Sequence, residues 1–576
     1  MECIEGLMQV EPVAMRRPST PQTRSFKTTW PSFVMLTLLS CAAVLGLALP
    51  TPITVYNDPT AQLKALQQYL AGTSPNFNTL VAAKADDLSR NEARWVSTWA
   101  PGMGMLLLPL LRLGLGMSSA LRILAAAAFV IGSLGWVRWL LLFDLPQWLL
   151  VTLAVGWPWM RYANNPLFQY YTESLTYAIA PWLLVGAVWL ARRMEAGVTL
   201  QTVLGALCVG LGFGVAYWLK YSGVFLAAGL CAFLCIRGWR QRNSFSRSIR
   251  TFAIGLIVAV PFLLLVAGLN ALNRSMGASA NYVVETAGRN LSWRNVVDTM
   301  GFVPLAMADA DSALQYIFFK PSRPQPFDPV WLRVCALPVA ILTLWLVFRR
   351  RTTDPSLGAA RWALLITLCA IFGVWSFSRG INHEARHIAA PAMALVPAVL
   401  AEGILVSQRG RLARKLLLIA AIGFIFAPLA YGAASVIAKS RRVPHGYQTT
   451  GVGLYHPALA ISNESASLAE LLKDYSPDRD VWYAPDGLTA LFLPGRMMVR
   501  QADFESLEHL RGEVFKTSVP LRVLVLLPRH FEQNGKGVAI RSSFVQAERW
   551  EKLEIPGCDD IRWAAELEPE LPHSAE

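Results

Sequence analysis

The stretch Leu200–Lys220 reads LQTVLGALCVGLGFGVAYWLK, which is twenty uncharged residues followed by a lysine. About 20 mostly apolar residues are needed for a helix to cross the hydrocarbon core of a bilayer. The stretch therefore predicts a membrane-spanning helix that ends at Lys220. The glycines at 210, 212 and 214 lie inside the span, where they favour close helix packing over phosphate binding.

Apolar runs of this kind recur along the chain. Its 576 residues are 54% hydrophobic and 16% charged, with a mean hydropathy of +0.39, whereas soluble domains carry about 25% charged residues. This composition excludes a soluble globular protein and a disordered chain. We predict about eleven spans in a mainly α, polytopic helix bundle. Besides Leu200–Leu219, the predicted spans are Ser32–Pro50, Ser118–Leu140, Leu145–Met160, Ser174–Leu190, Gly223–Ile236, Phe252–Leu272, Val330–Phe348, Ala359–Phe377, Ile388–Val406 and Leu416–Ile437.

The basic residues set the predicted orientation. The net charge of +14 would suggest nucleic acid in a soluble protein. Here the arginines cluster between spans, and with eleven spans the clusters fall on the side of the N-terminal arginines. That side is predicted to be cytoplasmic, with no nucleic-acid partner. The clusters are Arg138; Arg192 and Arg193; Arg237 to Arg250; Arg349 to Arg351; and Arg409 to Lys415, whereas Lys439, Arg441 and Arg442 are an exception on the outer side.

The predicted topology divides the chain into three parts. Residues 1–31 form a cytoplasmic segment, 32–438 a transmembrane domain with outer loops at 51–117 and 273–329, and 439–576 an outer soluble α/β domain. Counting Pro101–Met117 as a span would put the arginine clusters on the wrong side, so we predict an interfacial helix there. In the tail we predict strands at Asp480–Ala484 and Val523–Leu527, with a helix at Phe504–Phe515 between them.

Ionisable residues at the outer ends of spans are the candidate site residues, because charges at membrane depth are costly and usually functional. All of them face one compartment in the predicted topology, so a carboxylate pair and a cation cluster could converge there. The candidates are Asp58, Glu173, Lys220 and the cluster His383, Glu384, Arg386 and His387.

Each candidate also has a purely structural interpretation. Asp58 could cap a helix that starts at Pro59, and Glu173 could favour a helix N-terminus. Lys220 could extend to the interface among aromatic residues. His383 and His387 have the spacing of metal ligands on a helix but lack a clear third ligand. The histidines of the tail are scattered, without metal-ligand spacing, so no metal site is assigned.

The order of these features resembles that of GT-C membrane glycosyltransferases, and most closely the protein-mannosyltransferase and aminoarabinose-transferase branch. The resemblance covers Ser32–Val406. It departs from the family where Pro59 follows the first acid in place of Glu, where Glu stands at 173 in place of Asp, and where His stands at 387 in place of an aromatic residue. The residues that carry it are Asp58, Trp99 to Gly104, Glu173, Gly212, Gly214, Lys220 and Arg386 to Pro391.

The resemblance implies transfer of a sugar from a polyprenyl-phosphate donor, with inversion, to a lipid, glycan or protein acceptor. The reaction would take place at the outer face of a bacterial inner membrane. Asp58 would be the general base, and Glu173 would orient the acceptor. Lys220 and Arg386, with His383 and His387, would bind the donor phosphate. No nucleotide cofactor is expected, and a divalent cation is left open.

Two other classes of function stay open from the sequence alone. A transporter or flippase for a lipid-linked substrate predicts ionisable or helix-breaking residues at mid-span in paired halves. The ionisable residues of this chain lie at outer span ends instead. A non-catalytic membrane scaffold with an outer partner-binding domain predicts no requirement for Asp58.

Overall fold

The computed structural model describes most of the chain. Four of the candidate site residues, Asp58, His383, Arg386 and His387, lie outside the described residues, and so does Glu384. The described residues are 26–51, 53–55, 60–170, 173–229, 245–278, 291, 293–307, 355–377, 388–407, 428–441, 454–455, 475–485, 490–491, 493–500, 502, 505–527, 529–553 and 561–569, with single residues at 337, 340, 341, 345 and 426.

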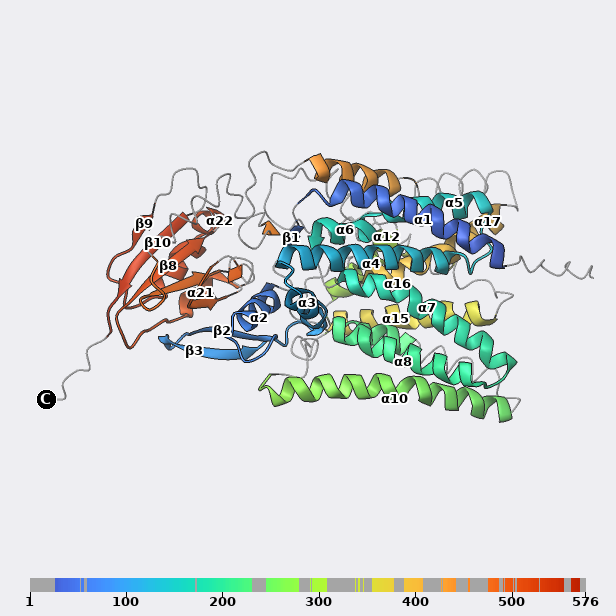
Figure 1. Ribbon diagram of the computed structural model, residues 1–576, viewed down its shortest axis with the longest axis horizontal. Helices are drawn as coiled ribbons and strands as arrows, with labels where there is room; N and C mark the ends of the chain where they lie inside the picture. The colour runs from blue at the N-terminus through green and yellow to red at the C-terminus, as the bar shows by residue number, and fades with distance from the viewer. Residues whose placement is uncertain are drawn as a thin grey trace, which may run out of the picture.

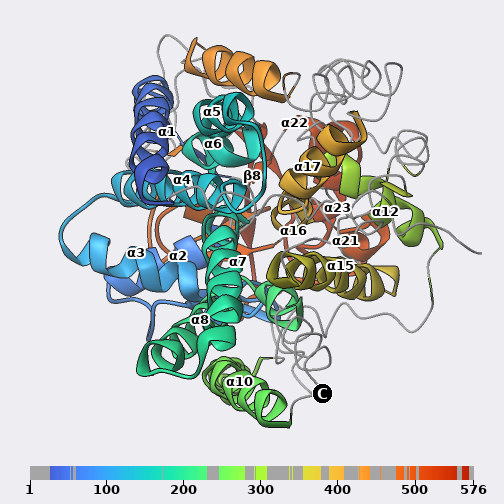
Figure 2. The same ribbon diagram turned by 90° about the vertical axis from the view of Figure 1, so that its right-hand side faces the viewer.

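Long apolar helices dominate the fold (Figure 1). In the described ranges, five helices are long and apolar enough to cross a membrane by length and composition, so the chain is a multi-pass membrane protein. The helices α4, α7, α8 and α10 follow one another across the bundle, each packed on the next (Figure 2). The five helices are α1 (Phe26–Ala48), α4 (Met117–Leu140), α7 (Glu173–Ala196), α8 (Leu200–Leu219) and α10 (Phe245–Ser275).

Two predicted spans are interrupted by prolines. The predicted span Leu145–Met160 is α5 (Gln147–Gly156), about 15 Å long at 1.5 Å per residue, followed by the 3-10 turn η1 (Trp157–Trp159). The predicted span Ile388–Val406 is divided into α16 (Ala389–Met393) and α17 (Val396–Ser407). Pro158 and Pro397 have no N–H to continue an α-helical hydrogen-bond ladder. The predicted span Ala359–Phe377 is confirmed as a helix, α15 (Pro355–Ser376), and α12 (Trp293–Met307) packs beside it.

The count of eleven spans is not confirmed. Much of the predicted spans Val330–Phe348 and Leu416–Ile437, and the second half of Gly223–Ile236, lies outside the described residues.

The segment predicted as the first outer loop is folded. It comprises α2 (Thr60–Leu70), an antiparallel hairpin of β2 (Thr79–Lys84) and β3 (Asp87–Trp95), and α3 (Gly102–Arg112). At about 16 Å, α3 is too short to span a bilayer. Its buried Met103 and Leu107 pack with α2 and with the start of α4. The hairpin was not predicted, because its strand β3 is mostly polar.

A small parallel sheet joins three distant parts of the chain at one end of the bundle. Its order is β4-β1-β5, with β1 (Ile53–Val55) between β4 (Gln169–Tyr170) and β5 (Leu454–Tyr455). The register pairs Val55 with Tyr170 and Thr54 with Tyr455. We call this end of the bundle, where the C-terminal sheet also lies, the sheet end (Figure 1).

The C-terminal part contains a five-stranded sheet in the order β7-β6-β8-β10-β9. The predicted strands are confirmed as β6 (Asp480–Ala484), which is fully buried, and β8 (Leu521–Leu527). The helix predicted at Phe504–Phe515 is shorter, because Ser506 caps its N-terminus and Glu513 has extended backbone. The other elements are β7 (Met497–Val499), β9 (Glu551–Leu553), β10 (Ile561–Leu567), α21 (Leu507–Gly512), α22 (Arg529–Gln533) and α23 (Lys536–Ser542).

The hairpin of the first loop holds this sheet against the bundle. The backbone N–H of Leu88 donates to the carbonyl of Lys516 at 2.8 Å, and Lys516 N–H donates to Ala85 at 3.2 Å. The Asp87 carboxylate accepts hydrogen bonds from both the N–H and the hydroxyl of Ser518. The side chain of Leu88 is buried in the core of the C-terminal sheet. The C-terminal part therefore packs on the first loop by main-chain as well as apolar contacts.

A buried lysine makes a second link, and it predicts how stability changes with pH. Lys64 of α2 is 5% exposed, and its ammonium donates to the carbonyl of Leu493 at 2.8 Å. Burial lowers the pKa of Lys64 to about 8, below the value of about 10.4 in an unfolded chain. Between these two pH values the unfolded state binds more protons than the folded state, so stability rises with pH.

We expect the contribution of Lys64 to raise the free energy of unfolding of the wild-type protein by up to about 3 kcal/mol as the pH rises from about 8 to 10.5. The measurement is the melting temperature in detergent across that range, compared with Lys64→Met, which cannot titrate. Parallel profiles for the two proteins would contradict the assignment.

Candidate functional site

An ion pair between two predicted site residues lies at the sheet end of the bundle. Glu173 is the first residue of α7, and Lys220 is the C-cap residue of α8. The Lys220 ammonium donates directly to Glu173 Oε1. Their side chains are 13% and 18% exposed, so both charges are largely shielded from water. Residues 47 positions apart, selected separately from the sequence, are thus brought into contact.

The chain reverses sharply at Lys220. The N–H of Lys220 donates to Ala216, and the N–H of Gly223 donates back to the Lys220 carbonyl at 2.8 Å. A Cβ on Gly223 would lie 2.5 Å from the carbonyl carbon of Ala216. Because a side chain at 223 would collide with the end of α8, glycine permits the tight turn that presents Lys220 at the helix end.

The Pro101-Gly102 step of the first loop packs against this turn. A Cβ on Gly102 would lie 2.8 Å from the carbonyl carbon of Trp218 and 3.0 Å from the Cα of Leu219. These are backbone atoms, which cannot rotate away. The short motif that carries the family resemblance in the first loop therefore lies against the residues just before Lys220.

We expect Gly102→Ala to destabilise the protein by about 1–3 kcal/mol, the usual cost of overpacking, and to displace the end of α8. Gly116→Ala is the matched control, because its Cβ would meet nothing within 4 Å and its φ is −65°. The check is the melting temperature of both variants in detergent. Equal melting temperatures would refute the close approach.

A polar network fixes the same turn from the other side. Asn273, fully buried at the end of α10, donates to the Tyr221 hydroxyl at 3.0 Å. It accepts a hydrogen bond from the Trp95 indole at 2.9 Å. Tyr217 donates to Asn270 at 2.8 Å. Buried polar groups that are fully paired specify one arrangement of their elements. The hairpin, α10 and the Lys220 turn are held together by this network.

The parallel sheet pairs β1, which ends shortly before Asp58 in the sequence, with β4, which ends shortly before Glu173. Val55 pairs with Tyr170, and in the sequence Asp58 is three residues after Val55, as Glu173 is three residues after Tyr170. Arg122 supports the start of this segment, since its guanidinium donates to the carbonyls of Leu49 at 2.6 Å and Thr51 at 3.1 Å.

A further cation was not selected from the sequence. Lys439 donates to Asn165 at 2.9 Å and lies 5.2 Å from the ring centre of Phe168. Both partners are on α6 (Arg161–Phe168), directly before β4. In the predicted topology Lys439 is an exception to the charge rule. Its contact with α6 places Lys439 near the β4–β1 pair. The sequence signal for such a residue is a basic side chain just past a span on the side where basic residues are not expected.

Comparisons with known proteins bear on the fold. No protein-family model matches the chain, and no curated protein does. The archaeal oligosaccharyltransferase AglB from Archaeoglobus fulgidus, solved with an inhibitory peptide and a dolichol-phosphate, is similar with a TM-score of 0.50 at 11% identity. The match covers 91% of this chain and 73% of that one. ArnT from Cupriavidus metallidurans bound to undecaprenyl phosphate is similar with a TM-score of 0.49 at 12% identity, over 93% and 98% of the two chains.

The likeness to AglB shows the fold. The chain has the polytopic membrane fold of that oligosaccharyltransferase, as the sequence resemblance implied. At this identity the residues of the site are not carried across, and they have to be argued from this chain itself.

Proposed function

We propose that the protein is a GT-C glycosyltransferase that moves a sugar from a polyprenyl-phosphate donor to an acceptor at the outer face of the membrane, with inversion. The observation that carries the proposal is the Glu173–Lys220 ion pair at the bundle end where β1 pairs with β4. A shielded cation paired with a carboxylate suits a leaving phosphate and an acceptor. The similar archaeal oligosaccharyltransferase was solved with a bound dolichol-phosphate.

In the proposed reaction the acceptor hydroxyl or amine attacks the anomeric carbon on the face opposite the phosphate. The new bond forms as the bond from the anomeric carbon to the phosphate oxygen breaks, and the polyprenyl phosphate leaves with that electron pair. Asp58 takes the proton of the acceptor as general base. The leaving phosphate gains charge in the transition state, and Lys220 stabilises it where water is largely excluded. Arg386, with His383 and His387, is proposed to bind the same phosphate.

Glu173 has a more definite role in this proposal than acceptor orientation alone. Its carboxylate holds the Lys220 ammonium in place before the donor binds. When the phosphate arrives, the ammonium can donate to both groups, since it has three N–H donors. Glu173 is therefore proposed as a positioning residue for Lys220.

The proposed orientation puts the sheet end outside a bacterial inner membrane. Arg138 ends α4, and Arg193 lies in the last turn of α7, both at the ends that point away from the sheet end. Arginines favour the cytoplasmic side, which supports an extracytoplasmic C-terminal domain at 439–576 and a transmembrane domain at 32–438.

Sugar transfer in proteoliposomes tests the proposal. Purified protein is reconstituted with a panel of radiolabelled polyprenyl-phosphate sugars and a total lipid, glycan and protein acceptor extract. The expected result is donor consumption and labelled acceptor with one donor, absent from vesicles that carry the double variant Asp58→Asn, Lys220→Gln. If no donor is consumed, a flipping assay on the same vesicles follows. Movement of a labelled lipid without transfer would replace the proposal with a transporter.

A further inference from the structure

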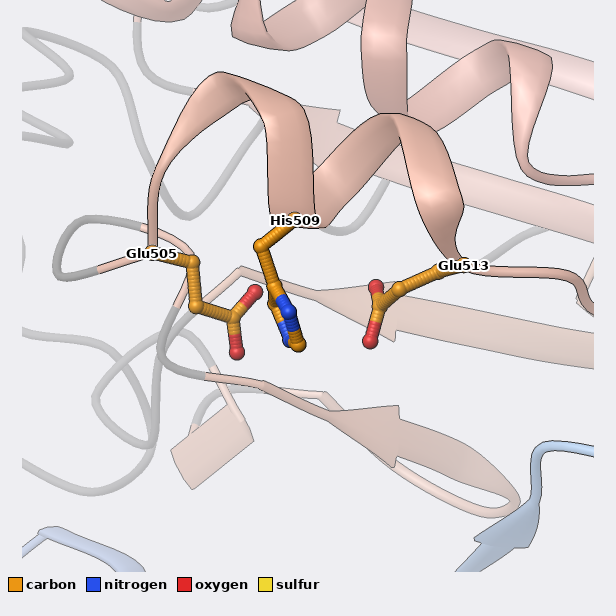
Figure 3. A group of neighbouring side chains, drawn as sticks. All are labelled: Glu505, His509 and Glu513. Atoms are coloured by element: carbon orange, nitrogen blue, oxygen red, sulfur yellow. The ribbon is translucent and has the colours of Figure 1, made fainter.

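Three potential metal ligands converge beneath the short helix α21 in the C-terminal sheet domain. Glu505 precedes the capping residue Ser506, His509 lies within the helix, and Glu513 is its C-cap residue. One ligand atom from each of the three side chains lies within 4.8 Å of the other two. Figure 3 shows the imidazole between the two carboxylates, with all three side chains directed to the same space. The spacing of four and eight residues puts them on one face of a helical turn.

The local structure fixes this arrangement. The Ser506 hydroxyl accepts the N–H of His509 at 3.1 Å and so starts the helix between Glu505 and His509. Leu510 is fully buried and anchors the helix to the sheet. Arg500, just after β7, donates to Glu513 Oε1 at 2.7 Å and holds this side chain, which is 10% exposed.

Two carboxylate oxygens are left over in the cluster. Glu505 Oε2 and Glu513 Oε2 are buried and have no hydrogen-bond partner within the described part of the chain. A buried acceptor without a partner is costly. A cation in the space that the two carboxylates share would give both of these oxygens a partner.

A second, independent observation concerns a buried tyrosine in the same apolar core as α21. The Tyr483 side chain of β6 is fully buried, and no described residue pairs with its hydroxyl. Tyr483 packs in one apolar core with Leu510 of α21 and with Phe515, two residues after Glu513. Its hydroxyl is a buried donor that needs an acceptor. A water molecule on an ion held by the cluster would supply that acceptor.

We propose that Glu505, His509 and Glu513 bind a divalent transition-metal ion of the zinc class, with water in the open position next to Tyr483. One imidazole and two carboxylates suit Zn²⁺ better than Mg²⁺ or Ca²⁺, which take oxygen ligands. Ligands about 2.1 Å from a tetrahedral ion lie about 3.4 Å apart. The side chains therefore close by about an ångström on binding, which the exposed His509 and half-buried Glu505 are free to do.

The site is separate from the proposed sugar-transfer site and does not depend on it. It joins Glu505, which precedes the N-cap residue of α21, to the C-cap residue Glu513, and Arg500 links Glu513 to the edge strand β7. The ion is therefore expected to stabilise the C-terminal domain.

Calorimetric titration of the full-length protein in detergent with ZnCl₂ tests the site. The background is Asp58→Asn, Glu173→Gln, His383→Asn, His387→Asn, which removes two candidate carboxylates of the membrane domain and the histidine pair with metal-ligand spacing. One equivalent of Zn²⁺ is expected to bind and to raise the melting temperature. His509→Asn and Glu505→Gln are each expected to weaken binding at least about tenfold and to abolish the rise. Mg²⁺ is expected to give neither effect.

Glu548→Gln is the matched control, because Glu548 is an exposed carboxylate of the same domain outside the cluster, and it is expected to bind Zn²⁺ as the background protein does. Because His509 is exposed, its replacement is expected to leave the fold intact. The Zn²⁺ affinity of His509→Asn therefore tests the site even if a Glu505 variant misfolds. Equal Zn²⁺ affinity in His509→Asn, or no Zn²⁺ binding by the background protein, would overturn the proposal.

Discussion

Replacing Asp58 with asparagine is expected to lower the rate of sugar transfer by about 10²- to 10⁴-fold, the usual contribution of a general base. Asparagine has nearly the same shape and still forms hydrogen bonds, but it cannot take the acceptor proton. The KM for the lipid donor is expected to change little, because Asp58 is proposed to act on the acceptor. The measurement is transfer of labelled sugar in proteoliposomes as kcat and KM for the donor.

The control for Asp58→Asn is Asp86→Asn. Asp86 is 68% exposed in the hairpin turn, where it pairs with Lys84 at 2.8 Å. The two substitutions remove the same charge, and only the first lies in the segment that continues β1. Comparable losses in both variants would indicate a general effect of charge. Unchanged turnover in Asp58→Asn would remove this residue from the mechanism and make Glu173 the next candidate for the base.

The sequence predicted the presence of the described helices well, but it predicted their ends less well. Apolar runs of about 20 residues at Leu200–Leu219 and Ser118–Leu140 are long helices, as expected. Leu145–Met160 and Ile388–Val406 were wrong as continuous spans, since hydropathy counts Pro158 and Pro397 as ordinary residues and does not register the missing N–H.

The site residues were found one at a time and not as a pair. Glu173 and Lys220 were each selected because an ionisable residue at a span end is unusual. Their contact depends on the packing of α7 on α8 and on the turn at Gly223, which no local pattern contains. The β4-β1-β5 sheet could not be predicted either, because strands of two or three residues have too few positions for a periodic pattern.

The ligand cluster in the tail was missed for a different reason. The histidines of the tail are scattered in the sequence, but His509 has a glutamate four residues away on each side. A pattern of His or Cys pairs does not include mixed sets with carboxylates. The helix predicted at Phe504–Phe515 already placed all three residues on one face.

The Glu173–Lys220 pair permits a test that separates positioning from direct catalysis. Lys220→Gln is expected to lower kcat by about 10²- to 10³-fold, as the loss of one donor to a developing oxyanion does. Glu173→Gln is expected to have a smaller effect, because the ammonium stays but is no longer held. The informative measurement is the double variant.

If Glu173 acts through Lys220, the double variant transfers sugar no more slowly than Lys220→Gln, because nothing is left to position. If Glu173 contacts the acceptor itself, the two losses multiply, and the positioning role is refuted. Lys84 and Asp86 provide the control cycle, since this exposed pair should couple only weakly in stability and leave kcat unchanged. Removing one partner of the shielded pair should cost more, up to about 3 kcal/mol, so each variant is assayed well below its melting temperature. A loss of kcat that persists at this temperature reflects weaker stabilisation of the transition state, because the departing phosphate then lacks the charge that Lys220 supplies.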